Sequence, residues 1–299
     1  MGRGVIYHET ECKSAMNRVE GMSFRWSLNP YQGCAHGCHY CYARRYHAYR
    51  QLDPSSQFAS ELYVKTNVAA VLRQELRRPS WLGDQVAIGT ATDPYQPVEG
   101  RYRLTRACLL ALADHDNPAS LVTKGTLIVR DTDILSTMAA GNGISVVFSL
   151  TTLDTDLWQR LEPGTPPPLQ RLRAMQRLVA AGVRAGVLLA PILPGITDGP
   201  ASLEQLVATA ADHGAQFLGA QTLYLKEGTR QHFLGYLRQQ HPQLLSTYAR
   251  LFPGAYAPKR FQRELKEHVS RLKESYQLVD APAPPKRAIQ QLTFLRSDI

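Results

Sequence analysis

Three of the five cysteines in this 299-residue sequence lie within eight residues, as Cys34, Cys38 and Cys41, with the spacing C-x3-C-x2-C. Thiolates so close in sequence can converge on one metal centre, and soft sulfur ligands select zinc or iron–sulfur clusters. A cubane 4Fe–4S cluster normally takes four cysteines, so a trio leaves one iron with an open coordination position. The spacing therefore predicts a metal centre at which a small ligand can bind and react.

Two other interpretations of the cysteine trio are open at this point. The first is structural zinc with His36 or His39 as fourth ligand, since zinc uses sites of three cysteines and one histidine. The second is a disulfide, which is disfavoured because the number of cysteines is odd and the N-terminus lacks the apolar core of a signal peptide. The other two cysteines, Cys12 and Cys108, stand alone in the sequence.

The residues around the trio resemble a known family. Tyr40, an aromatic residue, stands directly before the third cysteine, as in radical S-adenosylmethionine (radical SAM) enzymes. The longer run NPYQGCAHGCHYCYAR is similar to the spore photoproduct lyase-like branch of that superfamily. In the order that this branch shows, the motifs TATDPYQPVE, LVTKG, FSLTTLD, LEP and APILPGITD follow between residues 90 and 198. The resemblance covers residues 24–225.

The resemblance implies a set of cofactors and residue roles. Cys34, Cys38 and Cys41 would bind a 4Fe–4S cluster, and S-adenosylmethionine (SAM) would bind its open iron. An external electron donor of the flavodoxin or ferredoxin type would drive cleavage of SAM to a 5′-deoxyadenosyl radical. Such a radical can take hydrogen from an unactivated C–H bond, which acid–base side chains cannot do. Tyr40 matches the family's aromatic packing position. Residues similar to those that contact SAM in this branch are Tyr42, Lys124 and Ser149.

One position departs from the pattern of the branch. Spore photoproduct lyase has a cysteine near the end of the second strand that returns a hydrogen atom to the product, whereas this sequence reads GTATD at 89–93. Cys108 lies on the next predicted helix and is expected to be a core residue. The resemblance therefore does not extend to thymine-dimer repair, and it leaves the substrate unassigned.

An alternation of strands and helices must position these residues. Apolar or alternating runs predict strands at 24–29, 85–90, 119–123, 144–150, 184–192 and 216–223. Three- and four-residue apolar spacing predicts helices at 42–50, 67–78, 104–115, 132–140 (with Asp131 as N-cap), 169–181 and 203–213. This rhythm is typical of parallel βα units, and six units are too few for a closed eight-stranded barrel. The predicted fold class is α/β, an open six-unit (β/α)6 partial TIM barrel.

In such a barrel the functional side chains lie on loops after the carboxyl ends of the strands. The cysteine loop follows the first strand, so we expect the metal centre at that end. The residues that end the other strands are Thr90, Thr92, Asp93, Lys124, Ser149, Thr151, Pro191, Pro194, Gln221 and Tyr224. Among them we expect Thr92 to contact the cofactor, Lys124 to bind a carboxylate and Ser149 to bind a ribose hydroxyl.

The chain divides into three predicted parts. Residues 1–23 show no clear periodicity and are predicted to be an extension lying against the main domain, which spans 24–225. Residues 226–299 are predicted to be a C-terminal helical extension, with helices at 229–240 and 258–276. A proline-rich connector at 281–285 precedes a short strand-like or docking segment at 289–295.

Composition bears on partners and location. The sequence has no apolar run of about 18 residues, so we expect no membrane span, and reduced thiols with a labile cluster predict a cytoplasmic protein. The formal net charge of +9 makes nucleic acid a candidate partner; the oligomeric state is not predicted. Two alternatives to a radical enzyme are a zinc-stabilised nucleic-acid-binding protein and an iron–sulfur electron carrier that does not cleave SAM.

Overall fold

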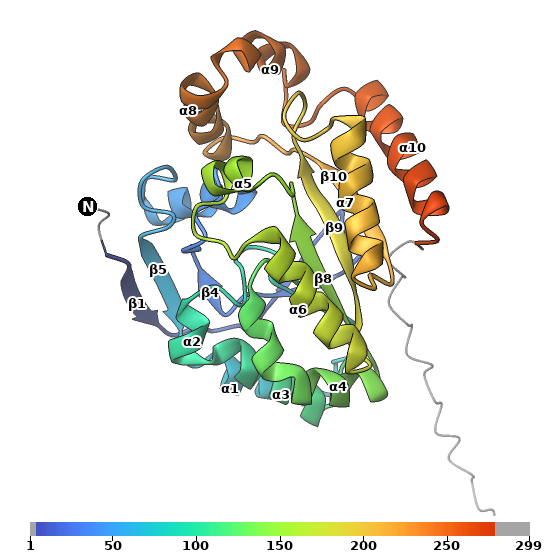
Figure 1. Ribbon diagram of the computed structural model, residues 1–299. Coiled ribbons are helices and arrows are strands. Elements are labelled where there is room, and N and C mark those ends of the chain that lie inside the picture. Colours follow the sequence, from blue (N-terminus) through green and yellow to red (C-terminus); the bar gives the residue numbers. More distant parts are fainter. Residues whose placement is uncertain (1–3, 279–299) are drawn as a thin grey trace, which may run out of the picture.

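The computed structural model describes residues 4–278, and its main feature is a seven-stranded sheet (Figure 1). The strand order is β10-β9-β8-β7-β6-β3-β2, and all neighbours are parallel except β2, which pairs antiparallel with β3 at one edge. The strands are β2 (Met16–Arg18), β3 (Trp26–Leu28), β6 (Val86–Ile88), β7 (Ala119–Thr123), β8 (Ile144–Leu150), β9 (Arg184–Ile192) and β10 (Leu218–Thr222). A mostly parallel sheet confirms the predicted α/β class.

The middle strands form where β-branched and aromatic residues are densest. In β8, with the sequence ISVVFSL, five of seven residues are buried, because β7 and β9 pair on its two sides and helices cover it. The strands β7, β8 and β9 have the bounds that the apolar runs predict.

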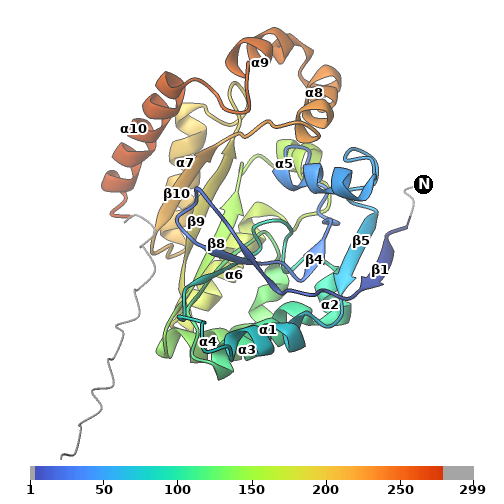
Figure 2. The ribbon, with the colours of Figure 1, turned by 180° about the vertical axis from the view of Figure 1, so that it is seen from behind.

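A second, three-stranded sheet was not predicted. It has the order β1-β5-β4 and consists of β1 (Ile6–Thr10), β4 (Tyr31–Gln32) and β5 (Glu61–Lys65). The predicted extension at 1–23 contains two strands that its sequence did not indicate, because β1 and β2 both arise there and pair with strands of the predicted main domain. Figure 2 shows β1, β4 and β5 on the side of the molecule opposite α10.

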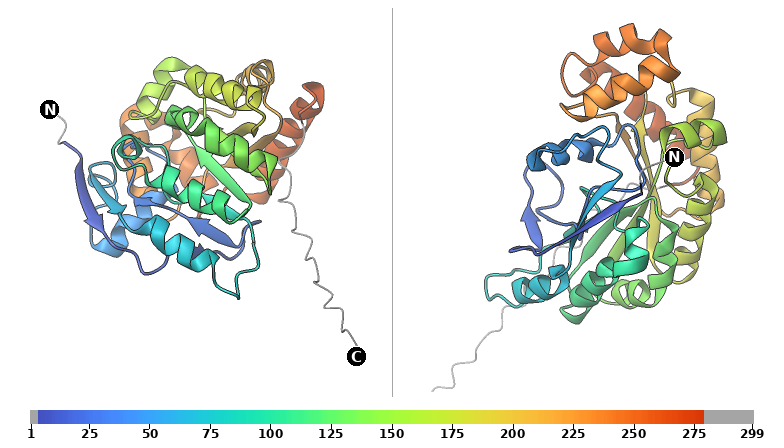
Figure 3. Two further views of the ribbon diagram at one scale, coloured as in Figure 1. Left: turned by 90° about the horizontal axis from the view of Figure 1, so that it is seen from below. Right: turned by 90° about the vertical axis from the view of Figure 1, so that its left-hand side faces the viewer.

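Helices between the parallel strands pack on the outer face of the large sheet (Figures 1 and 3). They are α1 (Val68–Leu76), α2 (Val98–Tyr102), α3 (Leu104–Asp114), η2 (Thr126–Asp131), α4 (Thr132–Ala140), α6 (Pro168–Ala180) and α7 (Pro200–Asp212). The short helix α5 (Thr155–Leu161) instead packs beside the cysteine loop and α8. The predicted helix at 42–50 is a 3-10 helix, η1 (Tyr42–Arg50). Asp131 precedes α4 but does not cap it through its side chain, because its carboxylate instead accepts hydrogen bonds from Arg106, Arg130 and Tyr95.

The last helices of the described chain are α8 (Thr229–Gln240), η3 (Pro242–Leu244), α9 (Leu245–Leu251) and α10 (Lys259–Ser275). In Figure 1, α8 and α9 lie beyond the carboxyl ends of β8 and β9. Phe233 and Tyr236 of α8 belong to the same apolar cluster as Cys38 and Tyr40 of the cysteine loop. The helices α8 and α9 therefore cover the end of the sheet where the cysteines lie, whereas α10 packs beside α7 and β10.

Two predictions fall outside these residues: the proline-rich connector at 281–285 and the segment at 289–295. No helix within residues 4–278 combines the length and apolar character needed to cross a membrane.

Candidate metal and cofactor site

The cysteine loop leaves β4 through a turn that only glycine can make. Gly33 has φ of 82°, and a Cβ there would lie 2.8 Å from the carbonyl oxygen of Glu61. The Gly33 carbonyl accepts hydrogen bonds from Thr92 Oγ1 (2.6 Å) and Gln96 Nε2 (3.0 Å), and Gln96 Oε1 accepts from the Ala35 amide (2.8 Å). Side chains of the loop after β6 therefore hold the backbone of the cysteine loop in place through hydrogen bonds.

The three cysteines lie together as free thiols. Cys34 and Cys38 are buried and Cys41 is partly buried. Hydrogen bonds from the Gly37 amide to Cys34 O (3.1 Å) and from the Cys41 amide to Cys38 O (3.3 Å) turn the loop back on itself. Burial raises the pKa of all three thiols, and for Cys38 burial and the Glu162 carboxylate raise the pKa to about 12. A metal centre bound here must displace protons from the thiols.

The histidines of the loop are engaged elsewhere. His36 Nδ1 lies 3.3 Å from Asp93 Oδ2, and His39 Nδ1 lies 2.9 Å from Nε2 of His232 on α8. Within residues 4–278 no group of three or more His, Cys, Asp or Glu side chains is arranged to hold a metal ion. A closed tetrahedral zinc site needs four converging ligands, and both histidines of the loop have other partners.

A second group of polar side chains gathers after β7 and β8. Lys124 Nζ donates to Ser149 Oγ (2.5 Å), and Ser149 Oγ donates to the carbonyl oxygen of Ala190 (2.8 Å). The Tyr40 hydroxyl contacts Thr151 Oγ1 (2.9 Å), and the Lys124 ammonium lies 5.7 Å from the centroid of the Tyr40 ring. The structure thus brings together three of the predicted cofactor residues: Tyr40, Lys124 and Ser149.

A buried carboxylate organises this group. Glu162 is 1% exposed, accepts a hydrogen bond from Tyr40 and forms an ion pair with Arg171, which is fully buried. Lys124 Nζ lies 3.9 Å from Glu162 Oε1. Burial alone would raise the pKa of Glu162, but the charges of Arg171 and Lys124 lower that pKa to about 2. One carboxylate between two cations leaves a formal charge of +1, which suits an anionic group such as a ligand carboxylate.

Asp93 connects the two groups. Its Oδ2 accepts from the Lys124 amide (2.6 Å) and lies beside His36, while its Oδ1 accepts from Thr123 Oγ1 (2.6 Å). Burial opposes ionisation, but His36 and these hydrogen bonds lower the pKa of Asp93 to about 2. A carboxylate predicted only as a strand-end residue therefore fixes the loop after β7 against the cysteine loop.

The other predicted residues lie differently. Thr92 is buried and its hydroxyl bonds to the loop backbone. Tyr42 begins η1, is 38% exposed and contacts Tyr46 edge-on, so it stands apart from the group around Lys124. Cys108 is fully buried in α3, as predicted.

Sequence reasoning missed four residues of the site: Arg44, Gln96, Glu162 and Arg171. Arg44 and Glu162 lie inside motifs that the resemblance singled out, but a motif does not show which carbonyl or carboxylate a side chain reaches. Glu162 and Arg171 pair across a turn between α5 and α6, and nothing in the local pattern marks that pair.

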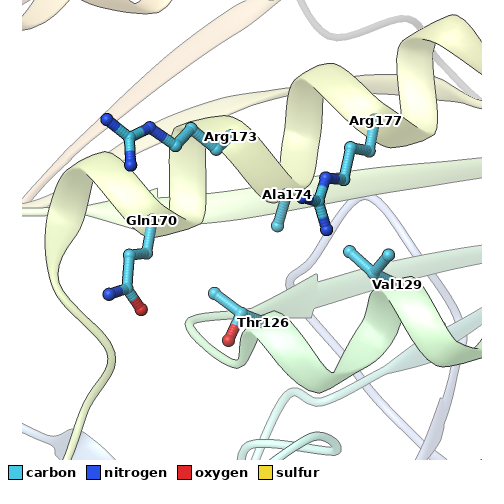
Figure 4. Close-up of a pocket in the computed structure, with 6 residues that line it drawn as sticks. All are labelled: Thr126, Val129, Gln170, Arg173, Ala174 and Arg177. Atoms are coloured by element: carbon cyan, nitrogen blue, oxygen red, sulfur yellow. The ribbon is translucent and has the colours of Figure 1, made fainter.

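Two surface grooves lie outside this group. One, of about 350 Å³, runs between η2 and α6 (Figure 4) and is lined by Thr126, Val129, Gln170, Arg173, Ala174 and Arg177. The other, of about 460 Å³, is lined by Thr152, Leu153, Asp154, Thr155, Asp156, Ser202 and Gln205. No predicted cofactor residue lines either groove, so Arg173 and Arg177 of the first groove offer control positions.

Comparison with known proteins adds to this geometry. A family model described as the radical SAM superfamily matches residues 28–207. An uncharacterised protein of Mycobacterium tuberculosis (strain ATCC 25618 / H37Rv) is 43% identical over 289 residues, covering 95% of this chain and 85% of the relative. An uncharacterised protein of Methanocaldococcus jannaschii is 24% identical over 236 residues, covering 78% and 83%.

Among solved structures, spore photoproduct lyase complexed with dinucleoside spore photoproduct is similar, with a TM-score of 0.69 and 16% identity, covering 90% of this chain and 79% of that chain. A mutant of that lyase with bound AdoMet and the dinucleoside has a TM-score of 0.68 and 17% identity with the same coverage. At these identities the likeness concerns the fold.

Proposed function

This chain belongs to the radical SAM superfamily, and from that premise we propose that Cys34, Cys38 and Cys41 bind a 4Fe–4S cluster whose open iron binds SAM. Enzymes of this superfamily use the cluster and SAM to produce a radical that abstracts hydrogen from the substrate, and they generally take the electron from an external donor. The observation that carries the proposal is the trio of neighbouring free thiols joined through Asp93 to the buried group around Lys124.

The side chains of this site have separate proposed roles. Glu162 balances the charge of Arg171, so one positive charge remains on Lys124. Lys124 would therefore bind the carboxylate of SAM. Ser149, held between Lys124 and the Ala190 carbonyl, would bind a hydroxyl group. Tyr40 packs against this group, and Tyr42 would contact the cofactor from the exposed side of the loop. Thr92 was expected to contact the cofactor, but its hydroxyl donates to the Gly33 carbonyl, so its proposed role is to hold the backbone of the cysteine loop.

Three wider proposals accompany this one. The six parallel strands β3, β6, β7, β8, β9 and β10 lie in sequence order in the sheet, which supports an open partial barrel. The electron donor would be of the flavodoxin or ferredoxin type, and the protein would work in the cytoplasm, where such donors and reduced thiols persist.

Nucleic acid is the substrate class that the surface beside the cysteines supports. On η1, Tyr46 contacts both Tyr42 and Tyr49, and Tyr49 is 76% exposed. The Arg45 guanidinium lies 5.1 Å from the Tyr46 ring centroid. Exposed aromatic rings with arginines suit stacked bases and phosphates, and a similar solved structure holds a dinucleoside photoproduct.

Anaerobic reconstitution followed by incubation with a reductant and SAM tests the enzyme. We expect iron and acid-labile sulfide in the protein and release of 5′-deoxyadenosine, and we expect both to be lost in Cys38→Ala. Cys12→Ser, which changes a partly buried cysteine near α1, is the matched control and should keep both. Zinc without sulfide would favour the zinc-stabilised protein, and a cluster that yields no 5′-deoxyadenosine would favour the electron carrier.

Binding of labelled single-stranded DNA and RNA, followed by fluorescence anisotropy, tests the substrate class. Loss of one stacked base costs about 1–3 kcal/mol, so Tyr49→Ala should weaken binding by roughly 5- to 140-fold. Arg177→Ala, at the groove of Figure 4, is the control and should not reproduce the loss of affinity seen in Tyr49→Ala. Equal binding by Tyr49→Ala and the unmodified protein would remove the support that η1 gives to nucleic acid.

A further inference from the structure

We infer that Arg44 is a positioning residue for the metal centre: its buried guanidinium, bonded to the backbone of the cysteine loop, would raise the reduction potential of the cluster. The inference rests on the proposed function, because it concerns the cluster that the trio would bind. It assigns a task to a side chain that neither the cysteine spacing nor the strand-end pattern singles out.

The guanidinium of Arg44 is fixed by four backbone carbonyls and lies over the Phe58 ring, 4.8 Å from the ring centroid. The side chain is 2% exposed. Its Nη2 donates to Gly37 O (2.6 Å) and its Nε to Cys38 O (3.0 Å), within the cysteine loop. Its Nη1 donates to the carbonyl oxygens of Pro54 (3.0 Å) and Ser55 (3.2 Å), in the segment after η1. These bonds join two segments of backbone around one planar fork of donors.

The charge of Arg44 has no carboxylate partner in contact. Among residues 4–278 no Asp or Glu oxygen lies within 4.0 Å of its nitrogens, whereas the other deeply buried arginine, Arg171, pairs directly with Glu162. Asp53 is the carboxylate whose charge reaches Arg44, but it is exposed and accepts hydrogen bonds from the Ser55 and Ser56 amides. Burying a cation without a paired anion is costly, so this position calls for negative charge from another source.

The cysteines are that source. Burial lowers the pKa of Arg44, and the three groups that oppose this most strongly are Cys41, Cys38 and Cys34. Each becomes a thiolate when it binds metal, so metal binding would bring negative charge to the loop whose backbone Arg44 holds. The fixed position of the guanidinium, bonded to the carbonyl of Cys38 itself, keeps this charge at a constant distance from the ligands.

A buried positive charge beside a cluster favours the reduced state, because reduction adds negative charge. Cluster potentials depend on net charge, hydrogen bonding and solvent exposure, and a low local dielectric strengthens the effect of the charge. Arg44 therefore acts through the cluster, and its removal should lower the reduction potential even where the cluster is still bound.

The test compares the full chain with Arg44→Lys and Arg44→Gln, each reconstituted anaerobically. The readouts are iron and sulfide per chain and the midpoint potential from a redox titration followed by electron paramagnetic resonance. We expect a lower potential in Arg44→Gln and a smaller shift in Arg44→Lys, which keeps the charge and loses the fork. Arg177→Gln, which removes an exposed arginine at the groove of Figure 4, is the control and should keep the unmodified potential.

Each outcome decides the inference. If Arg44→Gln fails to bind a cluster while Arg44→Lys binds one at a potential near that of the unmodified protein, the requirement for positive charge is supported. If Arg44→Gln binds a cluster at the unmodified potential, or if neither variant binds one, the charge has no separate role and the inference is wrong. Failure of the unmodified protein to bind an iron–sulfur cluster would instead overturn the proposed function, so the two failures are distinguishable.

Discussion

Arg44 and Arg171 are both buried, but they lie in two halves of the site, one around the cysteines and one around Glu162, that differ in how a buried positive charge is paired. Arg171 lies in α6 and pairs with Glu162, and Lys124 approaches the same carboxylate. Arg44 lies in η1 and bonds only to neutral carbonyls. In the half around Glu162 the protein itself compensates the buried arginine, and Lys124 leaves one positive charge. In the half around the cysteines, Arg44 is uncompensated, because no carboxylate of residues 4–278 is in contact with it.

The largest loss of stability that distinguishes the two halves should come from Glu162→Gln. This change leaves the Arg171 charge buried without an anion, and breaking a buried pair in this way costs about 3–5 kcal/mol. Arg44→Gln should cost the metal-free protein less, because no partner carboxylate is left unpaired. Urea denaturation of the metal-free variants measures both free energies of unfolding.

The double variant Glu162→Gln/Arg171→Met is the control for the charge pair. Removing both charges should recover much of the stability lost in Glu162→Gln. Equal destabilisation by Glu162→Gln and Arg44→Gln would contradict the distinction between a compensated and an uncompensated half.

Lowering the pH should destabilise the protein through the half of the site around Glu162. The folded protein holds the pKa of Glu162 at about 2, against an ordinary value of 4.5, so between these values the unfolded chain binds more protons than the folded one. Stability from this group is therefore present above pH 4.5 and falls as the pH drops toward 2. Thermal unfolding across this range should show the fall, and the double variant should show a shallower one, with Asp93 accounting for part of the remainder.

Alkali should act on the cysteine half. Burial, followed by Glu162, raises the pKa of Cys38 to about 12 from an ordinary value of 9.0. Stability from the neutral thiol is fully present below pH 9 and falls as the pH rises toward 12. Thermal unfolding of the metal-free protein should therefore weaken above pH 9, and Cys38→Ala should reduce that dependence. An unchanged alkaline slope in Cys38→Ala would contradict the burial of this thiol.

The smallest effect comes from comparing two glycines with the same backbone conformation. Gly33 and Gly182 both have φ of 82°, but a Cβ at Gly182 meets nothing within 4 Å, whereas one at Gly33 meets the Glu61 carbonyl oxygen. Alanine in this conformation costs about 1–3 kcal/mol at either site. Gly33→Ala should cost more than Gly182→Ala and should also reduce iron incorporation, because the cysteine loop must shift. Equal losses of stability and full iron in both variants would show that the turn at Gly33 does not set the loop.

Sequence reasoning reached the parts of the fold whose signal is local. The runs in β7, β8 and β9 are apolar and continuous, and the helix α8 has the bounds predicted from its periodicity. The strands β1 and β5 were missed because they are short and half-buried, and each is stabilised by a partner about 55 residues away in the chain. Such pairings depend on tertiary contacts that no short window contains.

The site divides in the same way. The cysteine trio is recognisable from spacing alone, and the rule that polar residues gather at the carboxyl ends of parallel strands brought Lys124 and Ser149 together correctly. That rule did not distinguish a side chain facing a ligand from one that holds a loop, which is why Thr92 was expected to contact the cofactor. The roles of Glu162 and Arg171 depend on burial and pairing, which only the folded chain shows.

We have proposed that Cys34, Cys38 and Cys41 hold a 4Fe–4S cluster with one iron open to SAM. Electron paramagnetic resonance of the reduced, reconstituted protein, recorded with and without SAM, is the sharpest test of this site. We expect a 4Fe–4S signal that changes when SAM is added and that is absent in Cys38→Ala. A signal that SAM leaves unchanged, or a protein that takes up zinc and no sulfide, would contradict the proposal.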